Sequence, residues 1–238
     1  MIDFRDRDKV GIVDIVVRLA ELNFRKKRNI FFLIVGETGS GKSYTALTLA
    51  DAIEKRYKNY LNVSKQIVYF PEQFKDVFEY VKEFKKKTII FDEAHVSISS
   101  RRWFDYTNMA INTILSTFRQ LHQCAVFFVA PLKSFIDKQV RGLVDYYIIV
   151  RKKLIDEQIV VYAQIYSVEK NYYDFTSDTT YIKKVVFKWK NRVWTAGNLK
   201  VPLPPEEIKN EYEKISSEFK AKIFLEKADK LANKLKRV

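Results

Sequence analysis

IFFLIVGETGSGKSYTALTLADAIEKRY, residues 30–57, carries the strongest structural signal in the chain. Its first six residues, Ile30–Val35, are all apolar, which is typical of a parallel strand covered on both faces. The next eight residues, 36–43, match the pattern G-x-x-x-x-G-K-[ST], and a helical segment follows from Lys42 to about Tyr57. Three of the chain's six glycines lie in this loop, so the stretch predicts a strand, a tight glycine turn and a helix in direct succession.

The loop has the residue types of a phosphate-binding site. Glycines let the backbone curl so that its N–H groups face a phosphate group, and the N-terminus of the following helix adds partial positive charge. Lys42 can reach the β- and γ-phosphates, and the Ser43 hydroxyl is a Mg²⁺ ligand in this motif. We therefore predict that ATP and Mg²⁺ bind at nine consecutive residues. They are Gly36, Glu37, Thr38, Gly39, Ser40, Gly41, Lys42, Ser43 and Tyr44.

Two carboxylates follow an apolar strand fifty residues after Lys42, in the segment TIIFDEAH at residues 88–95. Ligands gather at the carboxyl ends of strands in parallel sheets, so both side chains are expected beside the phosphate loop. We predict that Asp92 holds Mg²⁺ through water. Glu93 is predicted to polarise the water molecule that attacks the γ-phosphate. His95 is expected to be a loop residue and is not assigned to a metal.

Strands and helices alternate through the first 150 residues, which predicts an α/β layer fold with a parallel sheet. The predicted strands are 30–35, 66–70, 88–92, 125–130 and 146–150. The predicted helices are 12–24, 42–57, 71–84, 108–122 and 134–144.

The rest of the chain has a different pattern. Gln158–Val168 and Tyr181–Trp189 alternate in polarity and predict antiparallel strands. A proline-rich boundary precedes a long charged helix at Glu206–Arg237, whose apolar residues are spaced for packing on a partner or on its own domain. Both alternatives are open. The predicted units are a basic helical segment (1–29), an ATPase core (30–153), a β-rich extension (154–200) and the C-terminal helix (201–238).

Composition restricts the possible partners. The chain has 238 residues and one cysteine, which excludes an internal disulfide framework. No apolar run approaches the roughly 20 residues of a membrane span, and MIDFRDRDK at the start is no signal peptide. We expect a cytoplasmic protein. The 43 basic and 29 acidic residues give a net charge of +14, which suggests an anionic partner such as nucleic acid or an acidic membrane surface. The competing interpretation is a lysine-rich solvated surface, and composition alone does not separate the two.

The phosphate-binding and acidic motifs together resemble those of P-loop NTPases, in the class with an additional catalytic glutamate. The resemblance implies a three-layer sandwich with strand order 5-1-4-3-2. Over residues 30–153 the chain is also similar to zonula-occludens-toxin-like and FtsK/HerA-type DNA-pumping ATPases, including genome-packaging ATPases of filamentous phage and archaeal viruses. The residues that carry this similarity are FDEAH at 91–95, STFRQ at 116–120 and IDKQVR at 136–141.

This resemblance implies a homo-oligomeric ring, expected to be a hexamer, that hydrolyses ATP between subunits and moves along double-stranded DNA. Catalysis would then involve Lys42 and Glu93, with Arg119 or Arg141 acting on the neighbouring subunit's nucleotide. For each arginine a surface ion pair is the competing interpretation. A viral or plasmid packaging motor would associate with a capsid, and a replication ATPase with replication proteins. A viral protein would be located in the host cytoplasm or the virion.

One departure from the family leaves the function open. In the family that this chain resembles, a polar residue usually ends the fourth strand and senses the γ-phosphate. This chain has Ala130-Pro131 at that place, and Gln120 and Gln123 are the candidates to act as the sensor instead. The alternative is therefore a DnaA- or IstB-like replication ATPase, for which a helical lid is expected after the fifth strand. A nucleotide-switched adaptor without motor activity is the third possibility.

Three basic segments are candidates for contact with DNA: Arg25–Arg28, Arg151–Lys153 and Lys183–Lys200. The last of these contains Trp189 and Trp194, and basic residues near aromatic rings can follow a phosphate backbone. A tryptophan in an alternating strand is more often a core residue, which is the competing interpretation for Trp189.

Overall fold

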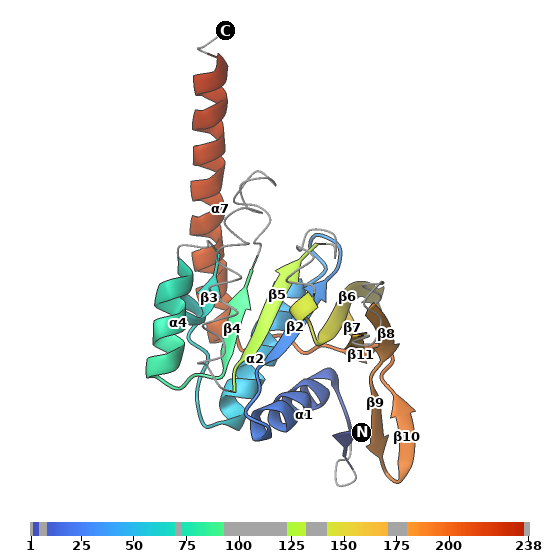
Figure 1. Ribbon diagram of the computed structural model, residues 1–238. Helices are drawn as coiled ribbons and strands as arrows, with labels where there is room; N and C mark the ends of the chain where they lie inside the picture. Colours follow the sequence, from blue (N-terminus) through green and yellow to red (C-terminus); the bar gives the residue numbers. More distant parts are fainter. Residues whose placement is uncertain are drawn as a thin grey trace.

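The fold is built on one central sheet with helices on both faces (Figure 1). A computed structural model describes residues 2–4, 9–69, 73–92, 123–131, 142–170 and 180–235. The strands of the central sheet are β2 (Ile30–Val35), β3 (Ile67–Val68), β4 (Thr88–Phe91), β5 (Ala125–Ala130), β6 (Tyr146–Ile155), β7 (Gln158–Lys170), β8 (Thr180–Lys184) and β11 (Leu199–Lys200). The helices are α1 (Ile12–Arg25), α2 (Lys42–Arg56), α3 (Val63–Gln66), α4 (Phe74–Glu83) and α7 (Glu206–Leu235). A small second sheet contains β1 (Ile2–Asp3), β9 (Val186–Trp189) and β10 (Arg192–Thr195).

The strand order confirms the predicted topology. The main path is β11-β7-β6-β2-β5-β4-β3, and its five strands from β6 to β3 are parallel. Numbered along the chain, these five run 5-1-4-3-2, as the resemblance implied. β2 therefore lies in the centre of the sheet, and the loop that follows it emerges at the carboxyl edge between β5 and β6.

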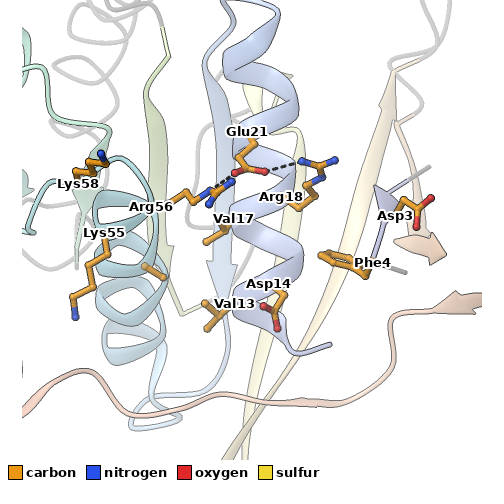
Figure 2. Close-up of a pocket in the computed structure, with 11 residues that line it drawn as sticks. Asp3, Phe4, Val13, Asp14, Val17, Arg18, Glu21, Lys55, Arg56 and Lys58 are labelled. Atoms are coloured by element: carbon orange, nitrogen blue, oxygen red, sulfur yellow. Dashed lines mark hydrogen bonds and ion pairs between the residues drawn. The ribbon is translucent and has the colours of Figure 1, made fainter. Parts of the chain in front are cut away.

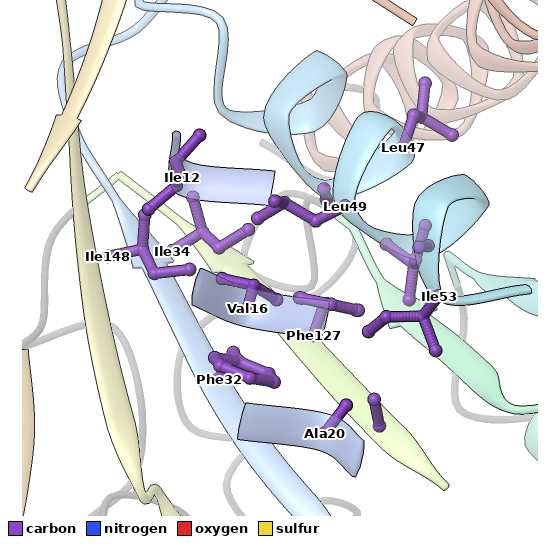
Figure 3. Packing of buried hydrophobic residues seen from close by; sticks show 14 of the residues in the cluster. Ile12, Val16, Ala20, Phe32, Ile34, Leu47, Leu49, Ile53, Phe127 and Ile148 are labelled. Carbon is purple, nitrogen blue, oxygen red and sulfur yellow. The ribbon is translucent and has the colours of Figure 1, made fainter. Parts of the chain in front are cut away.

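Successive side chains of the central strands enter two different cores. Phe32 and Ile34 of β2 pack with α1 and α2, whereas Leu33 between them packs on the opposite face with residues of α4. Figure 3 shows the first core, in which Val16 and Phe127 lie between the helices and the sheet. This alternation explains why both β2 and β5 are apolar throughout: neither face is exposed to solvent.

A buried carboxylate anchors the second half of α2 to the sheet. Glu54 is fully buried and accepts hydrogen bonds from Gln66 Nε2 (2.8 Å), Thr88 Oγ1 (2.7 Å) and Lys87 N (2.8 Å). Because the Gln66 side chain is turned toward Glu54 at the end of α3, the strand predicted at 66–70 begins one residue later. Its residues that pair with β4 are Ile67–Val68.

The fifth strand is longer than predicted. β6 continues past Val150 to Ile155 and returns antiparallel as β7, through a two-residue turn at Asp156 and Glu157. Both turn residues have positive φ (47° and 62°), the geometry of a tight hairpin turn that matches the twist of the strands. The run of apolar residues that predicted this strand ends at Val150, because the hairpin beyond it is exposed on both faces.

The strand predicted at 181–189 is divided between two sheets. β8 pairs with β7, and β9 pairs with β1 and β10 in the small sheet. Val185 between them is buried, donates its N–H to the Ile165 carbonyl oxygen (3.2 Å) and accepts from Ala196 N (2.8 Å). The chain therefore crosses from one sheet to the other at Val185, with its backbone polar groups hydrogen-bonded.

The first half of α7 lies on its own domain. Tyr212 and Phe219 are buried, and Ile208 and Ile215 pack against the same core as α1 and α2. Beyond this half the helix leaves the body of the molecule (Figure 1), and Leu225 is 62% exposed. Of the two alternatives left open by the sequence, packing on its own domain is confirmed for residues 208–219.

None of the helices in the described part of the chain is long and apolar enough to cross a membrane.

Replacing Phe127 with alanine is expected to destabilise the protein by about 3–5 kcal/mol. Its ring is fully buried and stacks on the Phe32 ring with centroids 5.0 Å apart, so its removal would leave a cavity in the core. The control is Leu154→Ala at the hairpin tip, where the side chain is 72% exposed and a change within about 0.5 kcal/mol is expected. Urea unfolding of both variants measures the difference, and equal losses would contradict the described core.

Candidate functional site

The loop between β2 and α2 has the geometry of a phosphate cradle. Gly41 precedes the first residue of α2 with φ 93°, and Gly39 has φ 74°, so both adopt a left-handed conformation that side chains disfavour. A Cβ atom on Gly36 would lie 2.4 Å from the carbonyl oxygen of Val150 on β6. Lys42 Nζ donates to the carbonyl oxygen of Glu37 across the loop (2.7 Å). The loop is therefore closed on itself, with the N-terminus of a 15-residue helix behind it.

Asp92 lies directly beside this loop. It follows β4, is 1% exposed, and accepts a hydrogen bond from the Ser43 hydroxyl group at its Oδ1 atom (3.0 Å). A hydroxyl oxygen and a carboxylate at this separation are the oxygen ligands that Mg²⁺ prefers, directly or through water. The residues present therefore fit a magnesium-bound nucleotide. Ser43 and Asp92 would hold the metal, which would neutralise charge on the phosphates, and Lys42 would contact the phosphates.

Helix α7 forms the wall opposite the loop. The Tyr212 hydroxyl group donates to Asp92 Oδ2 (2.6 Å), and Tyr44 donates to Glu213. Burial, followed by the hydrogen bond to Glu213 and its charge, raises the pKa of Tyr44 to about 12. Burial and the adjacent Asp92 carboxylate also raise the pKa of Tyr212, so both phenols are protonated donors at neutral pH.

The loop, the end of β5 and α7 enclose a cavity of about 730 Å³. Its lining residues are Thr38, Gly39, Gly41, Lys42, Ser43, Tyr44, Val129, Ala130, Pro131, Tyr212, Glu213, Ser216 and Ser217. This cavity brings together most of the nine predicted nucleotide-binding residues. Ala130 and Pro131 lie in its wall, so the position that the resemblance assigns to a γ-phosphate sensor faces the predicted site.

The hairpin that extends β6 supplies a cation that the sequence did not assign to this site. A Cβ atom on Gly39 would lie 3.7 Å from Lys152 Nζ, so this ammonium group lies over the phosphate loop. Lys152 belongs to the basic segment predicted to contact DNA. Its proximity to Gly39 depends on the pairing of β6 with β2, which no local pattern reveals.

Several predicted residues lie outside the described parts of the chain, namely Glu93, Arg119, Gln120 and Arg141. Gln123 is described, and the prediction that it substitutes as the γ-phosphate sensor is wrong. It lies before the amino end of β5, where its Nε2 donates to the carbonyl oxygen of Phe24 (3.1 Å). Because β5 is parallel to β2, this end of the strand is opposite to the phosphate loop.

A second hollow, of about 890 Å³, lies between α1 and the C-terminal end of α2 (Figure 2). Figure 2 shows Glu21 between Arg18 and Arg56, with Arg18 Nη1 at 2.9 Å from its carboxylate. Burial raises the pKa of Glu21, but the hydrogen bonds from Arg18 and Arg56 outweigh it and the pKa is lowered. Both arginines are thus engaged by a carboxylate, and the C-terminus of α2 adds partial negative charge.

A family model matches the part of the chain that contains the phosphate loop and Asp92. Residues 32–152 match the family model named AAA, the ATPase family associated with various cellular activities. No curated protein matches the chain in a sequence search. Among solved structures, a KaiC-like protein from the hyperthermophilic archaeon Pyrococcus horikoshii OT3 is similar, with a TM-score of 0.40 and 10% identity. The similarity covers 71% of this chain and 90% of that chain, and is too distant to support an inference about activity.

Replacing Gly36 with alanine is expected to weaken nucleotide binding at least tenfold, because the new Cβ atom would force the loop away from Val150. The control is Gly197→Ala, where no described atom lies within 4 Å of the added Cβ and φ is not in the left-handed region. Titration with a fluorescent ATP analogue measures both. Unchanged affinity in the Gly36 variant would contradict a tight cradle.

Proposed function

The chain belongs to the AAA family, the ATPases associated with various cellular activities, and we propose that it is a motor that couples ATP hydrolysis to movement along double-stranded DNA. The observation that carries the proposal is an exposed basic and aromatic surface in the same chain as the ATP site. A motor needs both, because the nucleotide supplies the free energy and the surface must hold the DNA backbone.

The small sheet provides the clearest part of this surface. β9 and β10 form a hairpin whose turn residues, Lys190 and Asn191, have φ 46° and 60°. Lys190 Nζ lies 5.0 Å from the centre of the Trp189 ring, and the Trp189 and Trp194 rings are 5.6 Å apart. Trp189 is half-buried and packs against the main core, whereas Trp194 is 43% exposed, so the pair reaches from the core to the solvent. Figure 1 shows the hairpin at the edge of the molecule.

Exposed basic side chains lie on this hairpin and on the strand that precedes it. Lys190 and Arg192 are exposed on the β9–β10 hairpin, and Lys183 and Lys184 are exposed on β8, where Lys183 forms an ion pair with Glu169 (2.6 Å). Cations that neutralise DNA phosphates release counterions, and this effect supplies binding without base recognition. Such binding suits a motor, which must pass over any sequence.

For the hydrolysis step we assign Asp92 and Ser43 to the metal, Lys42 to the β- and γ-phosphates, and Glu93 to the attacking water. In a ring, expected to be hexameric, Arg119 or Arg141 of the adjacent subunit would stabilise charge on the transferring phosphoryl group, an effect of about 10³–10⁵ in rate. The support for this arrangement, and for a role in viral or plasmid genome packaging, is the resemblance of the segments at 91–95, 116–120 and 136–141 to FtsK/HerA-type and zonula-occludens-toxin-like ATPases.

A DnaA- or IstB-like replication ATPase is the alternative. That class is expected to carry a helical lid after the fifth strand of the sheet. In this chain the described residues at 146–170 and 180–200 are strands and turns, and β6 leads directly into β7. This observation favours the motor over the helicase loader.

Addition of duplex DNA is expected to raise the ATPase rate of the wild-type protein, because a motor hydrolyses ATP when its track is bound. The Glu93→Gln variant is expected to bind ATP with unchanged affinity and to lose hydrolysis and movement on DNA. Phosphate release and displacement of a triplex-forming strand measure the two activities. DNA-dependent function that survives in Glu93→Gln would favour the nucleotide-switched adaptor, and stimulation without strand displacement would favour the replication ATPase.

The double variant Lys190→Glu and Arg192→Glu is expected to weaken binding to duplex DNA at least tenfold at low salt. Its log–log salt slope should fall by about one for each DNA phosphate that the protein no longer neutralises. The matched control is the double variant Lys82→Glu and Lys85→Glu. Both lysines are exposed, one on α4 and one just after it, and their replacement changes the net charge by the same amount as the test variant. Fluorescence anisotropy across a salt series measures both, and equal weakening would mean that net charge alone governs binding.

A further inference from the structure

The C-terminal helix reaches the centre of the ATP site from outside the strand–loop–helix unit that holds the phosphate loop. Between residues 208 and 219, α7 buries Tyr212 (6% exposed), Ser216 (5%) and Phe219 (7%) against the rest of the domain. The Phe219 ring packs on Tyr69 with centroids 4.7 Å apart, and the Tyr212 ring packs edge-on against Tyr44 at 6.1 Å. This part of the helix is therefore anchored both at Tyr212 and two turns beyond it.

Within this anchored segment, Tyr212 directs its hydroxyl group at the carboxylate that we assign to the metal. Among the described residues, two neutral donors contact Asp92: Ser43 at Oδ1 (3.0 Å) and Tyr212 at Oδ2 (2.6 Å). The terminal torsion of an aspartate is broad, so one hydrogen bond leaves the carboxylate plane free to turn. Two donors on different oxygens define that plane.

The two hydrogen bonds leave Asp92 able to act on a metal. A carboxylate oxygen has two acceptor directions, so Oδ2 can accept from Tyr212 and from a metal-bound water at the same time. Tyr212 is also neutral, which preserves the negative charge that attracts the cation. The geometry is thus that of an outer group that orients a metal-binding carboxylate, a role whose loss typically weakens metal binding.

We propose that Tyr212 is a positioning residue for magnesium binding, acting through Asp92, and that α7 is in this way part of the ATP site. The proposal rests on the nucleotide site of the proposed function and does not depend on DNA movement. Its competitor is a plug, in which the hydroxyl group occupies the place of a metal ligand and must leave before Mg²⁺ binds. The anchoring of the Tyr212 ring and of Phe219 favours positioning over a plug.

The test is the Mg²⁺ dependence of nucleotide binding in Tyr212→Phe, which removes one oxygen atom and keeps the ring. With a fluorescent ATP analogue in EDTA, we expect the affinity of the variant to equal that of the wild type. The Mg²⁺ concentration that gives half of the metal-dependent increase in affinity is expected to rise about 10- to 100-fold. The matched control is Tyr146→Phe, which deletes the hydroxyl group of a tyrosine at the opposite end of the sheet, packed on Phe32.

A second measurement separates positioning from a general structural effect. In an Asp92→Asn background the Tyr212→Phe change is expected to have no further effect on Mg²⁺ dependence, because the group through which it acts is gone. An additive effect there, or an unchanged Mg²⁺ requirement in Tyr212→Phe alone, would overturn the proposal. A lower Mg²⁺ requirement would overturn it in favour of the plug. If Tyr212→Phe fails to fold by circular dichroism, the hydroxyl group is structural and the proposal is also overturned.

These outcomes are distinct from a failure of the proposed function. If the wild-type protein binds the nucleotide with Mg²⁺ and does not move on DNA, the motor is wrong and the role of Tyr212 is still decided by the titration. If the wild type shows no affinity for the nucleotide with Mg²⁺, the ATP site itself is wrong.

Discussion

The buried carboxylate of Asp92 is the point on which the site depends. It lies at the carboxyl edge of the sheet with 1% exposure, and hydrogen bonds from Ser43 and Tyr212 reach its two oxygens. A buried charge is costly unless it is hydrogen-bonded, so these donors stabilise the folded protein as well as the site. Through Asp92, three segments far apart in the chain are joined: the phosphate loop, the end of β4 and the C-terminal helix.

The close approach of β6 to the loop is the second constraint. Because Val150 O lies where a side chain at Gly36 would have to be, the loop and the strand can be in contact only with glycine at this position. The same strand continues into the β6–β7 hairpin, which places Lys152 over the loop. Consequently the hairpin that extends β6 adds positive charge beside the phosphate loop.

Local sequence patterns predicted the structure correctly where a residue type has a single physical role. The run of apolar residues at Ile30–Val35 predicted a central strand, because only a strand covered on both faces needs no polar residue. The glycines and Lys42 predicted the cradle for a similar reason. The same reasoning failed where a side chain's role depends on distant residues: Gln66 ends a helix instead of starting a strand because it bonds Glu54, and Gln123 lies at the wrong end of β5 to sense phosphate.

The class of fold, the phosphate loop and the acidic strand end were all readable from the amino-acid sequence, since each is encoded within a short run of consecutive residues. What surrounds them emerged only from the folded chain. The apolar spacing of α7 was equally compatible with packing on a partner and with packing on its own domain. An apolar helix face indicates that the face is buried, but it does not indicate which surface covers it. The docking of residues 208–219 over the loop, and with it the contact of Tyr212 with Asp92, depends on contacts between residues 120 positions apart, which no local pattern contains.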